Sequence, residues 1–546
     1  MIAAQAPGFD GWLDAFFASY FRRRPVNATF IGMHAYDDRL PDLSERGQAG
    51  TLGDAEDLLR QLYALPPESL SLPQALDRQL AEGFLLIQRW ESRSEHFGSS
   101  NPSLLTGEAI FGLVSLLLRP FAPLQHRFDM ATARLEAVPS FLEAAMRQTG
   151  SAPAAWIDRA RRECTGARLL LGDGLARLLA EADLEHAALR RAAHGAAEAF
   201  GRFDTYLETE LLPHATHDYA SGGEALDLLL RHAHMLEVGA DGLERLALER
   251  IEEEELALRA SSASERAASA ATPEPADSGP AYLARFNAYW QAARDLCVEG
   301  DLVSFPDWPV RYSERPAWAR EAAPYLYFLP YRSPAPFDET PVVDYLVPPT
   351  SDDSTIKLNH VVHHGSLGHH VQNWFAARAA SRIGQIAAVD CASRIAMLCG
   401  GTMAEGWANY ATDVAEDSGF LTPAERHGQH RARLRMAARA IVDIRLHQGR
   451  WRLREAVDFY TQRVGMPAAA AQAEAVKNSL FPGAACMYLA GWDDIWRLRR
   501  EVEAHQKSAF ALRAFHDRIL SFGSIPVTLI ARAVLESPSV PALAQL

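Results

Sequence analysis

The stretch Leu169-Leu-Leu-Gly-Asp-Gly-Leu-Ala-Arg-Leu-Leu-Ala-Glu-Ala182 shows the pattern that decides the fold of this 546-residue chain. Its leucines recur at intervals of three and four residues, which is the period of an amphipathic α-helix. Alanine, arginine and glutamate, which are good helix formers, occupy most of the remaining positions. Similar sequence runs from Phe9 to about Ala260 and predicts a succession of helices.

Proline and glycine clusters divide this helical sequence into segments. They occur at Arg24-Pro25, Ser99-Ser-Asn-Pro102 and Gly150-Ser-Ala-Pro153. Such clusters mark turns, because proline cannot continue a helix and glycine tolerates turn conformations. The pattern therefore predicts helices that are stacked on one another through short connections.

The composition changes twice in the second half of the chain. Prolines, tyrosines and β-branched residues replace alanine between residues 305 and 349, which predicts a few short strands near the active-site cleft. The helical pattern then returns after Lys357 and continues nearly to Leu546, with turns near Gly419, Gly465 and Phe481-Pro-Gly483. We therefore predict a mainly α, multi-helical array.

The clearest boundary is the Ala-, Ser-, Glu- and Pro-rich stretch 261–280. We predict an N-terminal helical region at 1–260, a flexible loop at 261–280 and a metal-site catalytic region at 281–546. The two helical regions are expected to form one continuous fold.

Charge and composition exclude several classes of function. A net charge of −15 disfavours nucleic acid as a partner, and the apolar stretches are too short to span a membrane. The five cysteines fit no zinc-ribbon or redox spacing, so we expect reduced thiols, mostly in packing positions. The N-terminal residues lack the pattern of a secretory signal, so the expected location is the cytoplasm.

A histidine cluster is the strongest functional signal. Five of the 19 histidines lie between His360 and His370, and the pairs His363-His364 and His369-His370 bracket Gly-Ser-Leu-Gly. Two or three neutral imidazoles with one carboxylate can hold a metal and leave a position open for water or substrate. The cluster therefore predicts a catalytic metal site.

The spacing of these histidines also predicts a local distortion. In a regular helix His363 and His369 would lie about 9 Å apart along the axis, which is too far for one metal. The helix is therefore expected to break or bulge between them, and Gly365 and Gly368 provide backbone freedom there. The periodicity leaves open whether His369 or His370 faces the metal.

A carboxylate that could complete the site follows in Gly400-Gly-Thr-Met-Ala-Glu405-Gly-Trp-Ala-Asn-Tyr410. Glu405 stands among small and aromatic residues, and an ionised carboxylate is seldom buried without a partner. Either a metal or a cationic side chain could stabilise its charge. We favour metal binding by Glu405.

These elements resemble those of the bacterial family known as domain of unknown function 885, whose members typically carry HExxPGHH followed by EGWAxYxE. The resemblance extends over nearly the whole chain. It includes Thr29-Phe-Ile-Gly-Met-His-Ala-Tyr-Asp-Asp-Arg-Leu-Pro-Asp42, Phe481-Pro-Gly483 with Met487-Tyr488, and Phe515-His516 with Gly523-Ser-Ile-Pro526.

The resemblance implies a helical, metallopeptidase-like fold and one divalent metal, most favourably zinc. The number of histidines would also suit iron or copper. By position, His363 matches the first motif histidine, His369 and His370 match the GHH pair, and Glu405 matches the glutamate of EGWA. These four residues are the predicted metal site.

The chain departs from the family pattern at the residue that should act as general base. The glutamate after the first histidine is His364 here, the motif proline is Leu367, and the second glutamate of EGWAxYxE is Thr412. In a zinc peptidase that first glutamate takes a proton from water and later delivers it to the leaving amine. His364 would have to take this role with an altered pH dependence.

Further candidates lie downstream. Arg439, Asp443 and His447 recur every four residues, so they share one helix face and could orient a metal ligand or bind a substrate carboxylate. A surface ladder of ion pairs is the alternative. Tyr488 could donate a hydrogen bond to a developing oxyanion. His516 is expected to be a capping or packing residue.

The leading functional prediction is a metal-dependent hydrolase that cleaves an amide or peptide-like bond with metal-activated water. Its predicted catalytic residues are His364, Tyr488, His447 and Arg439, and its substrate is a small or peptide-like molecule. One alternative is a non-hydrolytic metalloenzyme, namely a lyase, an isomerase or an oxidative enzyme, because His364 replaces the glutamate. The other is a non-catalytic binding protein.

Overall fold

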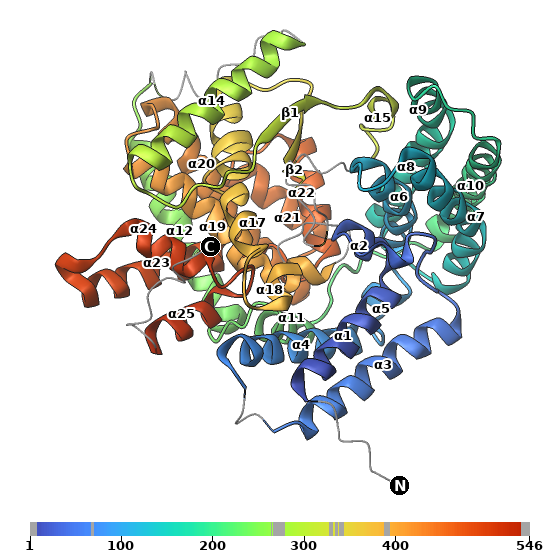
Figure 1. Ribbon diagram of the computed structural model, residues 1–546, viewed down its shortest axis with the longest axis horizontal. Coiled ribbons are helices and arrows are strands. Elements are labelled where there is room, and N and C mark those ends of the chain that lie inside the picture. Colours follow the sequence, from blue (N-terminus) through green and yellow to red (C-terminus); the bar gives the residue numbers. More distant parts are fainter. Residues whose placement is uncertain are drawn as a thin grey trace.

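The computed structural model describes residues 8–66, 70–263, 265, 279–326, 331–332, 337, 343–386 and 394–536. Helices make up most of this part of the chain, and three short strands accompany them (Figure 1). The prediction of a mainly α, multi-helical protein with a few strands is confirmed. None of the described helices combines the length and apolarity needed to cross a membrane.

The helices of the first region follow one another with short connections. They are α1 (Phe9–Arg23), α2 (Pro25–Phe30), η1 (His34–Tyr36), α3 (Glu45–Ala64), α4 (Leu72–Glu91), α5 (Glu95–Gly98), α6 (Pro102–Leu118), α7 (Leu124–Gln148), α8 (Ala154–Leu169), η2 (Leu170–Gly174), α9 (Leu175–Glu181), α10 (Ala187–Tyr206), η3 (Leu207–Leu211), η4 (Leu212–His214), α11 (Gly223–His232) and α12 (Gly239–Ala260).

The second region carries the strands and the remaining helices. They are α14 (Pro280–Glu299), β1 (Val310–Glu314), α15 (Ala317–Arg320), β2 (Tyr331–Arg332), β3 (Val343–Val347), α16 (Asp353–Thr355), η5 (Ile356–Gly365), α17 (His369–Ala376), α18 (Arg382–Ile386), α19 (Arg394–Asp417), α20 (Pro423–His447), α21 (Leu453–Gln462), α22 (Ala468–Leu480), α23 (Cys486–Gln506), η6 (Lys507–Ala509), α24 (Leu512–Leu520) and α25 (Val527–Glu536).

The predicted turns fall where helices end. Arg24 separates α1 from α2, and the stretches 99–101 and 149–153 separate α5 from α6 and α7 from α8. Gly419, Gly465 and Gly483 all have positive φ, between 72° and 76°, which glycine adopts without steric cost. These turn predictions are confirmed.

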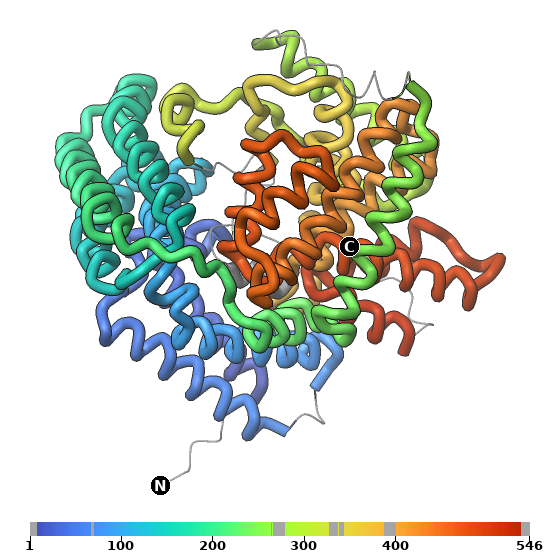
Figure 2. The backbone as a smooth tube through the Cα atoms, turned by 180° about the vertical axis from the view of Figure 1, so that it is seen from behind, coloured from blue at the N-terminus to red at the C-terminus, as the bar shows by residue number. Residues whose placement is uncertain are grey.

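One large hydrophobic core includes residues of both helical regions, from Phe9 to Val534. The long helix α12 lies along α20, although their sequences are far apart (Figure 2). Most of the predicted flexible loop at 261–280, namely residue 264 and residues 266–278, lies outside the described residues. Cys164, Cys297 and Cys486 are buried free thiols, as expected of packing residues.

The small sheet has the strand order β1-β3-β2, with β1 parallel and β2 antiparallel to β3. It is joined to η5 by a buried hydrogen bond of 2.6 Å between the Tyr345 hydroxyl of β3 and Nδ1 of His360. Nε2 of His360 is 3.1 Å from the Ser351 hydroxyl. The strands therefore support the segment that carries the histidine cluster.

The predicted helix break is present between His363 and His369. η5 is a π-helical segment that ends at Gly365, and α17 begins at His369. A helix end leaves backbone carbonyls without partners in the helix. The indole N–H of Trp290 donates to the Gly365 carbonyl at 2.7 Å, and that of Trp407 donates to the Leu367 carbonyl at 2.8 Å. Two tryptophans therefore stabilise the break.

Gly365 and Gly368 are needed there for a reason other than the predicted backbone freedom. Neither has a positive φ. A Cβ atom on Gly368 would overlap the His363 carbonyl oxygen, and one on Gly365 would overlap the Tyr312 hydroxyl. The glycines therefore allow the two ends of the break to approach each other closely.

A second close approach fixes the helix that carries Glu405. α19 crosses α23 where Gly406 meets the backbone of Gly491, and a Cβ atom on Gly491 would overlap the Thr402 carbonyl. Without side chains at these two positions the helices come into backbone contact. The crossing lies next to Glu405 in sequence, so it sets the position of that carboxylate.

The first prediction concerns Trp407→Phe, which removes the indole N–H but keeps an aromatic ring. The buried Leu367 carbonyl loses its donor, so the free energy of unfolding should fall by about 1–3 kcal/mol. Amide hydrogen exchange at residues 366–368 should accelerate in the same variant. The matched control is Trp374→Phe, because the Trp374 indole N–H has no hydrogen-bond partner in the described structure. Equal losses in both variants would contradict the assigned role.

The second prediction concerns Gly491→Ala. The added methyl group would meet the Thr402 backbone and separate α23 from α19, so we expect a loss of about 1–3 kcal/mol or more in unfolding free energy. Gly195→Ala in α10 is the control, since nothing lies within 4 Å of its Cβ position. That control should be neutral or stabilising by up to about 1 kcal/mol in urea denaturation.

Candidate metal centre

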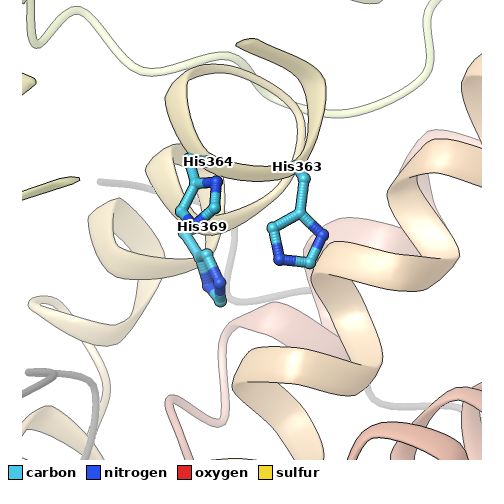
Figure 3. Close-up of side chains that lie close together, drawn as sticks. All are labelled: His363, His364 and His369. Carbon is cyan, nitrogen blue, oxygen red and sulfur yellow. The ribbon is translucent and has the colours of Figure 1, made fainter. Parts of the chain in front are cut away.

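Three imidazoles from two elements gather at the helix break. His363 and His364 come from the last turn of η5, and His369 is the first residue of α17. One ring nitrogen of each lies within 4.8 Å of one ring nitrogen of the others, and Figure 3 shows the three rings close together. The break therefore produces the grouping that an unbroken helix would prevent.

Glu405 reaches this group from α19. Its Oε2 atom is 3.5 Å from Nε2 of His363 and 3.7 Å from Nε2 of His369. The Glu405 side chain is 20% exposed, yet Oε2 is itself buried and has no hydrogen-bond partner in the described structure. A buried carboxylate oxygen without a donor is costly, and it points to a ligand that neutralises it.

The electrostatics of the group suit lone-pair donation to a cation. Burial raises the pKa of Glu405, but the neighbouring imidazoles of His363 and His369 more than offset this and bring the pKa to about 2. Burial lowers the pKa of His369 to about 4 and that of His364 well below its ordinary value. At neutral pH these groups are an ionised carboxylate and neutral imidazoles.

Hydrogen bonds behind the rings fix their orientation. Nδ1 of His364 donates to the Asn359 carbonyl at 2.7 Å, which leaves the Nε2 lone pair available. The His369 side chain interacts with Gln372, and Asn373 donates to the His369 carbonyl at 2.7 Å. Such outer contacts commonly orient metal-binding imidazoles. Gln372 and Asn373 did not stand out in the sequence.

His370 lies outside the cluster, so the structure does not bring this predicted metal ligand together with His363 and His369. It is fully buried, its ring centroid is 5.9 Å from that of Phe305, and it forms a hydrogen bond with the backbone of Trp308. Adjacent residues of a helix point about 100° apart, so only one of His369 and His370 can face His363. The structure selects His369.

His364, the predicted general base, lies in the three-histidine group, where one of its ring nitrogens is also a candidate metal ligand. The candidate ligands are therefore His363, His364 and His369, with Glu405 beside them.

The predicted shared face of α20 exists but does not bring His447 to the cluster. Asp443 accepts hydrogen bonds from the backbone amides of Gly483 and Ala485, at 2.8 and 2.7 Å. Nε2 of His447 donates to the Asn478 carbonyl at 3.0 Å. These residues hold the connection between α22 and α23, so His447 has a structural position.

Two histidines that the sequence did not single out hold the same connection. Nε2 of His96 lies 3.4 Å from the Leu480 carbonyl, and Nε2 of His234 lies 2.9 Å from the Gly483 carbonyl. Together with His447 they provide three imidazoles for one short segment. They are far apart in the sequence, so no local pattern could have revealed them.

Arg439 and Tyr488 lie together. The Arg439 guanidinium carbon is 5.1 Å from the centre of the Tyr488 ring, and Nε of Arg439 is 2.6 Å from Glu474. Tyr488 is in the first turn of α23, between Met487, which contacts Gly401, and Gly491 at the crossing with α19. The turn that carries Tyr488 is therefore packed against the helix of Glu405.

His516 is a packing residue, as expected. Its Nδ1 donates to the Leu302 carbonyl at 2.7 Å, and its Nε2 is 2.8 Å from the Tyr410 hydroxyl. Thr412 donates to the Asn409 carbonyl at 2.6 Å. Gln429 of α20 donates to the Thr412 hydroxyl at 2.5 Å, so Tyr410 and Thr412 both link α19 to neighbouring helices.

Two solved structures share this fold. A candidate lipoprotein of unknown function from Shewanella oneidensis is 20% identical, with a TM-score of 0.76 over 97% of this chain and 100% of that one. A candidate lipoprotein from Colwellia psychrerythraea is 16% identical, with a TM-score of 0.79 over 97% of this chain and 99% of that one. Comparison with curated proteins gave no match.

The family comparison covers almost the whole chain. The model described as "Bacterial protein of unknown function (DUF885)" matches residues 25–534. This range includes the break, the histidine cluster, Glu405 and the crossing of α19 with α23. The chain therefore belongs to the DUF885 family.

Proposed function

We propose that this protein is a metal-dependent hydrolase that cleaves an amide or peptide-like bond with metal-activated water. The observation that carries the proposal is the meeting of three imidazole nitrogens with the unpartnered Oε2 of Glu405. Zinc is the favoured metal, and iron or copper are the alternatives, since all three accept imidazole and carboxylate ligands.

The residues present fit a divalent cation. The imidazoles of the cluster are turned toward one another, and the carboxylate beside them has a buried oxygen that no protein donor satisfies. A divalent metal held there would polarise the carbonyl oxygen of a substrate and increase the acidity of bound water. His363, His364 and His369 would hold it, and Glu405 would stand at its side.

Glu405 can also supply the proton acceptor that the sequence lacks after His363. It is the carboxylate of the four-residue group, and its low pKa keeps it ionised at neutral pH. His364 is held by Asn359 as a member of the imidazole group and is less suited to that role. We propose that Glu405 accepts the proton while His363, His364 and His369 hold the metal.

Tyr488 and Arg439 have supporting roles in this proposal. A tyrosine hydroxyl can donate to the negative charge that develops on a carbonyl oxygen during hydrolysis. The Arg439 guanidinium over the Tyr488 ring, anchored by Glu474, restricts where that ring can lie. We therefore assign Tyr488 as the oxyanion donor and Arg439 as a positioning residue.

One observation favours a second candidate. Because His364 joins the ligand group, three imidazoles and one carboxylate could also hold iron or copper in a non-hydrolytic enzyme. Hydrolysis adds the elements of water to the product, so product mass separates the two chemistries.

The predicted cytoplasmic location and the absence of nucleic-acid and membrane partners stay predictions.

The third prediction tests the metal. Purified protein should contain a near-stoichiometric divalent metal by elemental mass spectrometry, and His363→Ala and Glu405→Ala should each lose most of it. Removal of one ligand or outer partner commonly lowers metal affinity 10–100-fold or more. The control is His194→Ala, an exposed histidine beside Glu198, which should keep the metal.

The outcomes separate the three functions. Zinc together with water-containing products supports the hydrolase. Iron or copper with products that have not gained water favours the non-hydrolytic enzyme. A metal-free protein in which Glu405→Ala changes neither stability nor ligand binding would leave the non-catalytic binding protein.

The fourth prediction distinguishes the two adjacent histidines. His369→Ala should lose the metal, because its ring lies in the cluster. His370→Ala should keep the metal but unfold more readily, by about 1–3 kcal/mol, since it leaves the buried backbone partner at Trp308 unsatisfied. Metal analysis and thermal unfolding of both variants check this. Loss of metal from His370→Ala alone would reverse the assignment.

A further inference from the structure

α20 carries a guanidinium that has no acidic partner. Arg435 is exposed, and within the described part of the chain it makes neither a hydrogen bond nor an ion pair. It stands one helical turn before Arg439 on the same face, a rise of about 6 Å. Several half-buried arginines of α20 are paired with acidic side chains, for example Arg433 with Asp413 and Arg445 with Glu244.

The carboxylate whose charge acts on Arg435, that of Glu474, already has a partner. Glu474 binds Nε of Arg439 at 2.6 Å. Burial raises the pKa of Glu474, but Arg439 more than offsets this and keeps the carboxylate ionised. Two guanidiniums therefore share one carboxylate, which leaves one positive charge unbalanced at this place.

The side chain of Arg435 is exposed, yet the surrounding protein partly desolvates its guanidinium. Desolvation by burial lowers its pKa, and the charge of Arg439 lowers it further, whereas Glu474 acts in the opposite direction. A guanidinium in open solvent would not be desolvated in this way. Where water is partly excluded, an anion gains more from a fixed positive charge than it would at an open surface.

The unbalanced charge lies one helical turn from the arginine that contacts the proposed oxyanion donor. Arg439, one turn from Arg435, lies over the ring of Tyr488. α23, which carries Tyr488, packs against both α20 and α19. Arg435 and Glu405 therefore lie on two helices that flank the same third helix. A peptide-like molecule bound at Glu405 could extend toward α20.

We propose that Arg435, supported by Arg439, binds a carboxylate group of the substrate, so that the enzyme acts on peptide-like molecules with a free carboxylate. Arginine suits this role because its planar guanidinium can donate two parallel hydrogen bonds to one carboxylate. That the carboxylate belongs to a substrate rests on the proposed hydrolase function, whereas the binding of a carboxylate at Arg435 does not.

The fifth prediction is a binding preference, measured by titration calorimetry with N-acetyl-alanyl-alanine and its C-terminal amide. The wild-type protein should bind the acid roughly tenfold or more tightly than the amide, as expected for hydrogen bonds to a charged group. Arg435→Gln should abolish the preference, and Arg435→Lys should restore part of it. Arg454→Gln removes an equal charge from an exposed position of α21 and should leave the preference unchanged.

A second pair of ligands identifies the source of the carboxylate. N-acetyl-glutamyl-alaninamide carries only a side-chain carboxylate, and N-acetyl-glutaminyl-alaninamide carries none. A preference for the first of these, lost in Arg435→Gln, assigns the subsite to an acidic side chain. A preference seen only with the C-terminal acid assigns it to the chain end. Both results support the carboxylate subsite.

The same titrations in His363→Ala separate this inference from the proposed function. If the acid preference persists without metal and disappears in Arg435→Gln, the subsite stands whether or not the protein is a hydrolase. If the preference disappears in His363→Ala but persists in Arg435→Gln, the metal binds the carboxylate and the inference is overturned. Equal affinities for acid and amide, or no binding of either, also overturn it. Because Arg435 has no partner to lose, its variants should keep the wild-type unfolding midpoint.

Discussion

The backbone carbonyls of Gly365 and Leu367 accept hydrogen bonds from side chains of other helices, and the candidate site depends on these two bonds. Trp290 from α14 and Trp407 from α19 donate indole N–H groups to these carbonyls. A buried carbonyl without a donor is costly, so the break persists only because both helices are in place. The break brings His369 back toward His363 and His364. The carbonyl partners of the break are therefore part of the architecture of the metal site.

Trp407 links this break to the carboxylate. It stands two residues after Glu405, so the helix that supplies the carboxylate also supplies the donor that stabilises the histidine turn. The backbone contact of Gly406 with Gly491 holds that helix against α23. A displacement of α19 would consequently move Glu405 and weaken the break at the same time. Three consecutive residues therefore have linked roles. Glu405 supplies the carboxylate, Gly406 allows the close contact with α23, and Trp407 donates the hydrogen bond to the break.

The structure also reassigns chemistry that the sequence placed in one region. Of the residues on one face of α20, Asp443 and His447 hold the connection between α22 and α23, while Arg439 contacts Tyr488. Arg435, which no motif contains, is left with an unbalanced charge. His363, His364 and His369, with Glu405 beside them, would thus hold the metal. Arg435, supported by Arg439, would bind the substrate carboxylate.

The amino-acid sequence by itself determined the helical class, the turns at Gly419, Gly465 and Gly483, and the need for a break between His363 and His369. These features are local, because they follow from helical periodicity, from glycine conformations and from the rise of a helix. It also indicated Glu405 as the partner of the histidines. Only the tertiary structure decided that His369 faces the cluster while His370 packs beside Phe305, and that His447, His96 and His234 serve one connection. Those choices depend on which side of a helix meets a neighbour from a distant part of the chain, and one-dimensional spacing does not contain that information.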